Sequence, residues 1–232
     1  MILRAEQRRV ARAEILYTNK SAGAILVSEI EAVSFAKRVR VPVISVPIGV
    51  DVSALAPKGT PEKAPHVMGF IGNLSVEANL ASLTHIVKNI LPHTPKEARL
   101  EVVGHVPFAV RETFSGEPRL HFLGEIGELA PVLHRWRLML SPIAFGSGIK
   151  TKVLTAMAAG LPVVTNDLGA EGINAKNGEE IIVENDVAAE IAATNALLEN
   201  EAHAREIGAA AHLFVKKHFD WKTVAPNFLK LL

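Results

Sequence analysis

The chain has 232 residues, of which 49% are hydrophobic and 21% charged, a composition typical of a globular protein with a substantial core. Lysine and arginine (25) almost balance aspartate and glutamate (24), so the net charge of +1 gives no general attraction to nucleic acid or to a membrane surface. The absence of cysteine excludes disulfides and thiolate metal sites, and 5% aromatic residues are too few to stack single-stranded nucleic acid.

The first predicted helix, residues 2–17, carries an arginine at every fourth position. Arg4, Arg8 and Arg12 would form one positive stripe. Such a stripe suits an anionic membrane or partner, but the opposite face is only weakly apolar, so we favour a solvated helix face. No signal-peptide core precedes it, and no apolar run approaches the roughly 18 residues that span a bilayer. We therefore expect a cytoplasmic protein.

Short apolar and β-branched runs then recur along the chain. They predict strands at 24–28, 41–47, 66–72, 99–104, 119–124, 138–142, 161–166 and 180–184. Helical stretches lie between most of them, at 29–39, 78–91, 126–137, 149–159 and 186–199. Apolar strands that alternate with helices predict an α/β fold with a doubly wound, mostly parallel, Rossmann-like sheet and helices on both faces.

The chain organisation follows from these elements. Residues 1–40 form an initial segment, and 41–65 read as a linker because four prolines follow residue 46. Residues 66–200 form the sheet domain. Residues 201–232 predict two further helices without strand signals.

One stretch, Pro142 to Asn166, suggests a ligand. Its glycine turn, Gly146-Ser147-Gly148, is followed by Lys150 and Lys152 at the start of a predicted helix. A helix N-terminus already carries about half a positive charge, so lysines there are unfavourable unless an anion is bound. Backbone N–H groups, a glycine turn and two lysines together predict a phosphate site. The alternative, two solvated lysines on a surface helix, stays equally open at this point.

Other familiar motifs are absent from the sequence. No G-x-G-x-x-G follows a strand, and "GSGIKTK" lacks the Gly-Lys-Ser/Thr step of a P-loop. The nine histidines are scattered without an H-E-x-x-H motif, so we expect no metal site. No G-x-S-x-G supports a nucleophilic serine.

An ordered set of segments resembles a known family. These segments include "FIGNLSVEANLASL", "ARLEVVG", "FLGEIGEL" and "SPIAFGSGIKTKVLTAMAAGLPVVTNDLGAEGI", and they extend over about 190 residues. The chain resembles the C-terminal, donor-binding half of retaining GT-B glycosyltransferases of the bacterial polysaccharide type (group 1-like). The resemblance implies a nucleotide-diphosphate sugar as ligand, sugar transfer to an acceptor as the reaction, and no cofactor.

The resemblance also implies roles for individual residues. The donor diphosphate would contact Gly72, Asn73, Gly146, Ser147, Gly148, Lys150 and Lys152. The loop at Glu125 and Ile126 would lie near the nucleobase. Fixed cations and N–H groups would stabilise the charge on the departing diphosphate, without a strict need for a metal.

Two departures from the family pattern bear on activity. Thr155 stands where the family usually has a glutamate that binds the ribose hydroxyls, and Ser147 stands at an earlier, often acidic position. Losing a hydrogen bond to a charged group costs about 1.5–3 kcal/mol, or roughly 10–100-fold in affinity. The acceptor-binding N-terminal domain is also almost absent, since residues 1–40 correspond only to its last elements. The family's residues from that domain therefore have no counterpart here, and the catalytic residues remain unassigned.

Three hypotheses follow. The chain is a donor-binding half that an N-terminal half on another chain, or in a longer protein, completes. Alternatively it is a degenerate module that binds a nucleotide sugar or a protein without transferring sugar. The least favoured is a different GT-B chemistry, such as a nucleotide-sugar epimerase. We expect the isolated chain to be inactive or incomplete.

Overall fold

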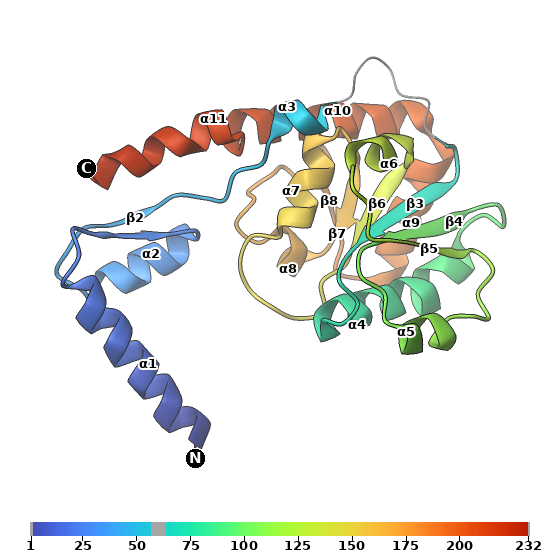
Figure 1. Cartoon of the computed structure of the whole chain (residues 1–232). Coiled ribbons are helices and arrows are strands. Elements are labelled where there is room, and N and C mark those ends of the chain that lie inside the picture. Colours follow the sequence, from blue (N-terminus) through green and yellow to red (C-terminus); the bar gives the residue numbers. More distant parts are fainter. Residues whose placement is uncertain (1, 57–63, 232) are drawn as a thin grey trace. The chain divides into compact units, whose positions relative to one another are not determined.

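The computed structural model describes residues 2–56 and 64–231 and divides them into two compact units (Figure 1). The first unit contains the described residues up to Gly49 together with those from Trp221. The second runs Val50–Asp220. Part of the predicted linker, 57–63, lies outside the described residues, and the rest of it contains β2 (Val43–Ser45) and α3 (Val52–Leu55).

The second unit is built on a six-stranded parallel sheet in the order β5-β4-β3-β6-β7-β8. Its strands are β3 (Val67–Ile71), β4 (Arg99–Val103), β5 (Leu120–Gly124), β6 (Leu138–Ser141), β7 (Val163–Thr165) and β8 (Ile182–Val183). Each lies within a predicted strand, and the residues of β6 and β7 are all buried, which explains why their sequences are mostly apolar. The predicted fold class is therefore confirmed.

The strand order fixes where a ligand would bind. From β3 the chain proceeds outward through β4 to β5, and from β6 it proceeds outward in the other direction to β8. The boundary between β3 and β6 is therefore the topological switch point of the sheet. In open parallel sheets, ligands bind beyond the carboxyl ends of the strands at such a point.

Helices cover both faces of this sheet (Figure 1). They are α4 (Glu77–His85), α5 (Phe108–Thr113), α6 (Ala130–Arg135), α7 (Thr151–Ala158), α8 (Asp167–Ala170), α9 (Val187–Glu199) and α10 (Glu201–His218). The predicted helix at 78–91 is not α-helical throughout, because α4 passes into a π-helical turn (Ile86–Ile90) and a short 3-10 segment (Leu91–His93). The predicted helix at 126–137 is shorter, and α3, α5 and α8 were not predicted.

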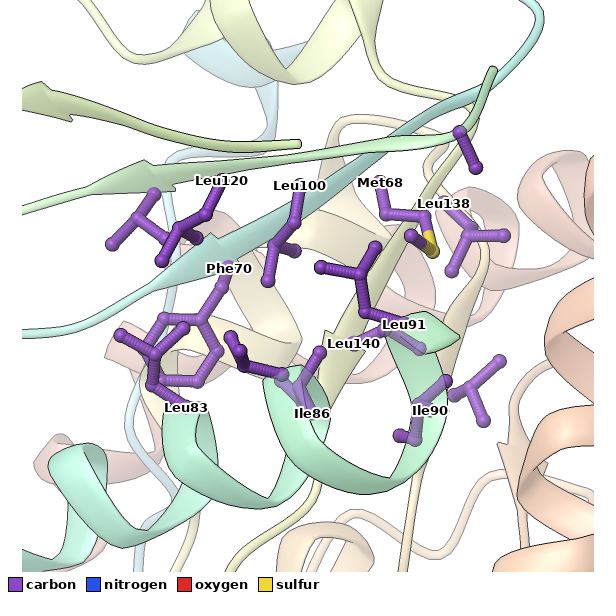
Figure 2. Close-up of a cluster of buried hydrophobic side chains, with 14 of the residues drawn as sticks. Met68, Phe70, Leu83, Ile86, Ile90, Leu91, Leu100, Leu120, Leu138 and Leu140 are labelled. Atoms are coloured by element: carbon purple, nitrogen blue, oxygen red, sulfur yellow. The ribbon is translucent and has the colours of Figure 1, made fainter. Parts of the chain in front are cut away.

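The core below α4 supports the carboxyl end of β3. Figure 2 shows Leu83, Ile86 and Ile90 pointing from this helical segment toward the strands. There they meet Phe70 and Leu100, and all five side chains are 0% exposed. Truncating such a side chain to alanine typically costs about 2–5 kcal/mol. The loop that follows β3 therefore begins from a rigid, fully packed layer.

The first unit is smaller. It contains α1 (Ile2–Thr18), β1 (Ala24–Leu26), α2 (Glu29–Ala36) and β2, with β1 parallel to β2, as well as α11 (Trp221–Val224) and a 3-10 segment (Ala225–Leu231). The second predicted C-terminal helix is thus α-helical for only one turn. Pro226 explains this, because proline lacks the N–H that an α-helix interior requires. In the part of the chain that the structure describes, we find no helix long and apolar enough to cross a membrane.

Candidate anion site at the carboxyl edge of the sheet

The two segments predicted to bind the diphosphate follow the two strands of the switch point. Gly72 and Asn73 come directly after β3, and the glycine turn at 146–148 follows β6. The helix predicted after that turn is α7, with Lys150 at its N-cap position and Lys152 in its first turn. Helix N-termini favour acidic side chains in the first turn, but the first turn of α7 has none. The lysines thus lie where the sequence predicted them.

A hydrogen-bonded chain joins the two segments. The Lys152 ammonium donates to Asn79 Oδ1 at 3.0 Å, and Asn79 Nδ2 donates to the Asn73 carbonyl at 3.0 Å. The Lys152 ammonium also lies 4.7 Å from the centre of the Phe70 ring, a cation–π contact. Asn79 therefore ties α7 to the loop after β3. Neither Asn79 nor Phe70 was predicted to belong to the site.

Lys152 is a desolvated cation. Burial, and to a smaller extent the charge of the neighbouring Lys150, lower its pKa from 10.5 to about 8. Its two partners, an amide and an aromatic ring, are neutral. Among the described residues no carboxylate forms an ion pair with Lys152, so an added anion would compensate the buried charge.

Lys150 has different surroundings. Its ammonium donates to the Gly148 carbonyl at 2.5 Å and lies 3.7 Å from Oε2 of Glu171. The same Glu171 oxygen accepts a hydrogen bond from the Gly148 N–H at 2.7 Å. Glu171 lies 23 residues from Gly148, in the loop after α8, so no local spacing in the sequence reveals the contact.

The glycine turn has the backbone geometry that the sequence suggested. Gly146 and Gly148 have φ values of +113° and +83°, which side-chain-bearing residues rarely adopt. Nothing lies within 4 Å of where a Cβ would stand at either glycine, so the turn is open to approach. Ser147 is exposed between them. Asn166 holds the other end of the loop, since its side-chain oxygen accepts from Ile143 N–H and its amide donates to Ile143 C=O.

The glycines that end three strands lie against one another. The Gly104 N–H donates to Gly124 C=O at 2.9 Å, and a Cβ added at Gly104 would stand 2.2 Å from Gly72 O. Gly104 also has φ +128°, so the position requires glycine twice over. The Gly72 N–H donates to Val103 C=O, so it is not a free donor, and a Cβ added at Gly72 would stand 3.0 Å from Asn79 Cγ and from Phe70 Cε1.

The remaining predicted residues are less directly connected to the lysines. Glu125 is exposed and Ile126 half-buried after β5, the outer strand on the far side of β4. Thr155 is one turn beyond Thr151 on α7, and its hydroxyl donates to the Thr151 carbonyl at 2.8 Å. Asn73 uses its side-chain oxygen locally, accepting from Ser75 N–H at 2.9 Å. No group of three or more potential metal-ligating side chains occurs within the described ranges.

A parallel α/β sheet with helices on both faces is a Rossmann-like domain, and here two lysines follow a strand of its switch point. A family described as "Glycosyl transferases group 1" matches residues 65–200, and the chain belongs to this family. The match covers most of the sheet domain and includes all the candidate site residues.

Among curated proteins, an uncharacterized 44.6 kDa protein in the cps region of Klebsiella pneumoniae is 25% identical over 175 residues. The alignment covers 69% of this chain and 44% of that protein. A glycogen synthase of Mycobacterium tuberculosis is 33% identical over 108 residues, covering 45% of this chain and 26% of the synthase. The chain thus spans less than half the length of these relatives.

Among solved structures, Staphylococcus aureus TarM superposes with a TM-score of 0.78 at 16% identity, covering 96% of this chain and 46% of TarM. HepE of Anabaena, solved in complex with UDP, gives a TM-score of 0.76 at 16% identity, covering 94% of this chain and 66% of HepE. At these identities the likeness establishes the GT-B fold.

Proposed function

We propose that the chain binds a nucleotide-diphosphate sugar at the carboxyl edge between β3 and β6, as the donor half of a sugar transferase. The observation that carries this proposal is Lys152, a desolvated cation with neutral partners at the switch point of the sheet. A diphosphate would supply the missing negative charge. The solvated-lysine alternative fits poorly with a lysine whose pKa is lowered by burial.

The same groups suit the chemistry of sugar transfer. Breaking the bond between sugar and diphosphate places negative charge on the leaving group. Lys150 and Lys152, with the N–H groups at the start of α7, would stabilise that charge as it develops. Their contribution is larger in a partly desolvated site than in water, because the local dielectric is lower.

The relatives suggest which nucleotide to try first. HepE has been solved with UDP and with UDP-glucose. The low identity carries no assignment of the base, so we propose uridine and guanosine diphosphates as parallel probes.

Features of the first unit favour the proposal that a separate acceptor-side domain completes the transferase. Its two parallel strands, β1 and β2, are short, and parallel sheets are normally covered on both faces. Ile30 and Val33 on α2 are 80% and 56% exposed, and Tyr17 on α1 is 68% exposed. These exposed apolar side chains and the short pair of parallel strands are the features that support an interface here. We propose that an acceptor-side domain, on another chain or in a longer protein, packs here and completes the cleft.

Thr155 favours a second candidate function, a module that binds nucleotide without transferring sugar. Its hydroxyl hydrogen is already donated to Thr151 C=O, and its short side chain replaces the family's longer glutamate. For either candidate we expect the isolated chain to bind donor without transferring sugar. Product analysis of incubations with UDP-glucose checks this, and transfer by the chain alone would contradict the need for a second half. A new nucleotide sugar formed without acceptor would indicate an epimerase instead.

Calorimetric titration tests the shared claim of both candidates. We expect UDP or GDP to bind the wild-type chain and the double variant Lys150→Ala/Lys152→Ala to lose at least about 10-fold in affinity. The matched control is Lys216→Ala/Lys217→Ala, which removes the same charge from exposed positions at the end of α10. Equal binding by both double variants, or no binding of either nucleotide to a folded wild-type chain, would refute the proposal.

A further inference from the structure

Glu171 lies at the glycine turn and makes contacts that a phosphate would make. One carboxylate oxygen, Oε2, accepts from the Gly148 N–H at 2.7 Å and faces the Lys150 ammonium at 3.7 Å. These two groups are among those to which the proposed function assigns the diphosphate. A carboxylate and a phosphate that approach the same N–H and the same ammonium repel each other.

The carboxylate is the more movable member of this ion pair. The Glu171 side chain is 40% exposed, whereas that of Lys150 is 14% exposed. A half-exposed glutamate can leave by rotation of its side chain, and the ion pair at such a site is weak. Lys150 is further held by its hydrogen bond to Gly148 C=O.

The loop does not depend on Glu171 alone for its position. Asn166 makes two hydrogen bonds to Ile143 at the start of the loop. At the other end Gly172 packs against Ile149, where an added Cβ would stand 2.9 Å from Ile149 Cγ1. Displacing the carboxylate would therefore leave both anchors of the loop in place.

We propose that the Glu171 carboxylate competes with the diphosphate for the Gly148 N–H and the Lys150 ammonium. Glu171 occupies both groups until a phosphate ligand displaces it. This inference rests on the proposed function, since it names the group that the donor displaces at the same site. A ligand must carry enough negative charge to displace the Glu171 carboxylate. A diphosphate, which reaches Lys152 as well as Lys150, displaces it more readily than a monophosphate.

The test is calorimetric titration of the whole chain with UDP, GDP, UMP and GMP, comparing wild type with Glu171→Gln. Glutamine keeps an oxygen that can accept from Gly148 N–H and removes only the charge. We expect Glu171→Gln to bind the diphosphates about 3- to 10-fold more tightly, as loss of one half-exposed repulsive charge implies. The matched control is Glu179→Gln, which removes the same charge from the exposed ion pair with Lys176 and should bind like wild type.

The titrations distinguish failure of this inference from failure of the proposed function. If wild type binds, Lys150→Ala/Lys152→Ala does not, and Glu171→Gln binds equally or more weakly, the proposed function stands and the competitor is refuted. If neither wild type nor Glu171→Gln binds any nucleotide, both fall. If wild type binds and Glu171→Gln binds the diphosphates more tightly, both the proposed function and the competitor are supported. Thermal unfolding of each variant establishes that the protein titrated is folded.

Discussion

Basic side chains gather at the start of α7 and along α1, and the two helices surround them differently. On α1, Arg8 and Arg12 are exposed, and the Arg9 side chain, 80% exposed, forms a surface pair with Glu6 at 3.5 Å. On α7, the lysines are drawn into the protein, one toward a glutamate and one toward neutral groups. Both helices carry several basic residues, so the number of charges does not distinguish a ligand site from a solvated face. We propose that the distinguishing feature is a desolvated cation with no carboxylate to compensate its charge.

The largest effect is expected for Lys152→Met, which removes the desolvated charge from α7. We expect diphosphate affinity to fall about 10- to 100-fold, because a charge-assisted contact in a partly buried site is lost. We expect the free energy of unfolding to stay unchanged or to rise by up to about 1 kcal/mol, because an uncompensated charge is replaced by an apolar chain. Calorimetry and chemical denaturation measure the two quantities, with Lys216→Met as the exposed control. A large loss of stability would mean that Lys152 is structural.

The affinity for diphosphate should also depend on pH. Lys152 has its pKa lowered to about 8, so it is charged below that pH and loses its charge above it. Diphosphate affinity should therefore be full below pH 8 and fall as pH rises above it, by at most about 10-fold per pH unit. If Lys152 had the ordinary lysine pKa of about 10.4, diphosphate affinity would stay constant up to about pH 10.

Stability should move in the opposite direction over the same range. The unfolded chain keeps the Lys152 proton up to about pH 10.4, while the folded chain releases it near 8, so this group's contribution to stability rises with pH between those values. Binding and unfolding measured at pH 7, 8, 9 and 9.5 test both trends. Both should be absent in Lys152→Met, and a pH-independent affinity in wild type would show that Lys152 is not in the binding site.

A smaller effect is expected one turn along α7. Thr155→Glu would restore the longer acidic side chain that the family usually carries there. We expect about 3- to 10-fold tighter binding of UDP or GDP, through hydrogen bonds to the ribose hydroxyls. The dideoxy nucleotides, which lack those hydroxyls, should show no gain. Equal gains for both kinds of nucleotide would place Thr155 away from the ribose.

The smallest effect is expected on α1. Arg8→Ala/Arg12→Ala should leave diphosphate affinity within about 2-fold and stability within about 0.5 kcal/mol, as surface substitutions usually do. The same titrations and denaturation curves measure it. A marked loss of binding would show that the solvated face of α1 contributes to the anion site and would undo the contrast between the two helices.

The sheet was predictable because most of its strand residues are apolar and, in β3, β4, β6 and β7, buried. All the predicted strands exist, and the order of strands then explains why the loops after β3 and β6 lie together. The short helices α5 and α8 were not predictable, because one or two turns carry too little periodicity. No local sequence motif predicted the π-helical turn at Ile86–Ile90 either.

Within the candidate site, the sequence identified the basic groups but not what surrounds them. The glycine turn and the two lysines are contiguous, and a helix start makes their charge conspicuous. Glu171 and Asn79 contact them only through the tertiary fold, across 23 and 73 residues. The difference between Lys150 and Lys152 is therefore invisible in the sequence, although they stand two positions apart.

The most direct test of the anion site is to observe its two lysines themselves. NMR of the chain with ¹³C-labelled lysine side chains, titrated with pH in the absence and presence of UDP or GDP, reports the charge of each lysine. We predict one lysine signal with a pKa near 8 that is missing from Lys152→Met and that shifts to a higher pKa when the diphosphate is added. A Lys152 pKa that stays unchanged under saturating concentrations of both nucleotides would contradict the account.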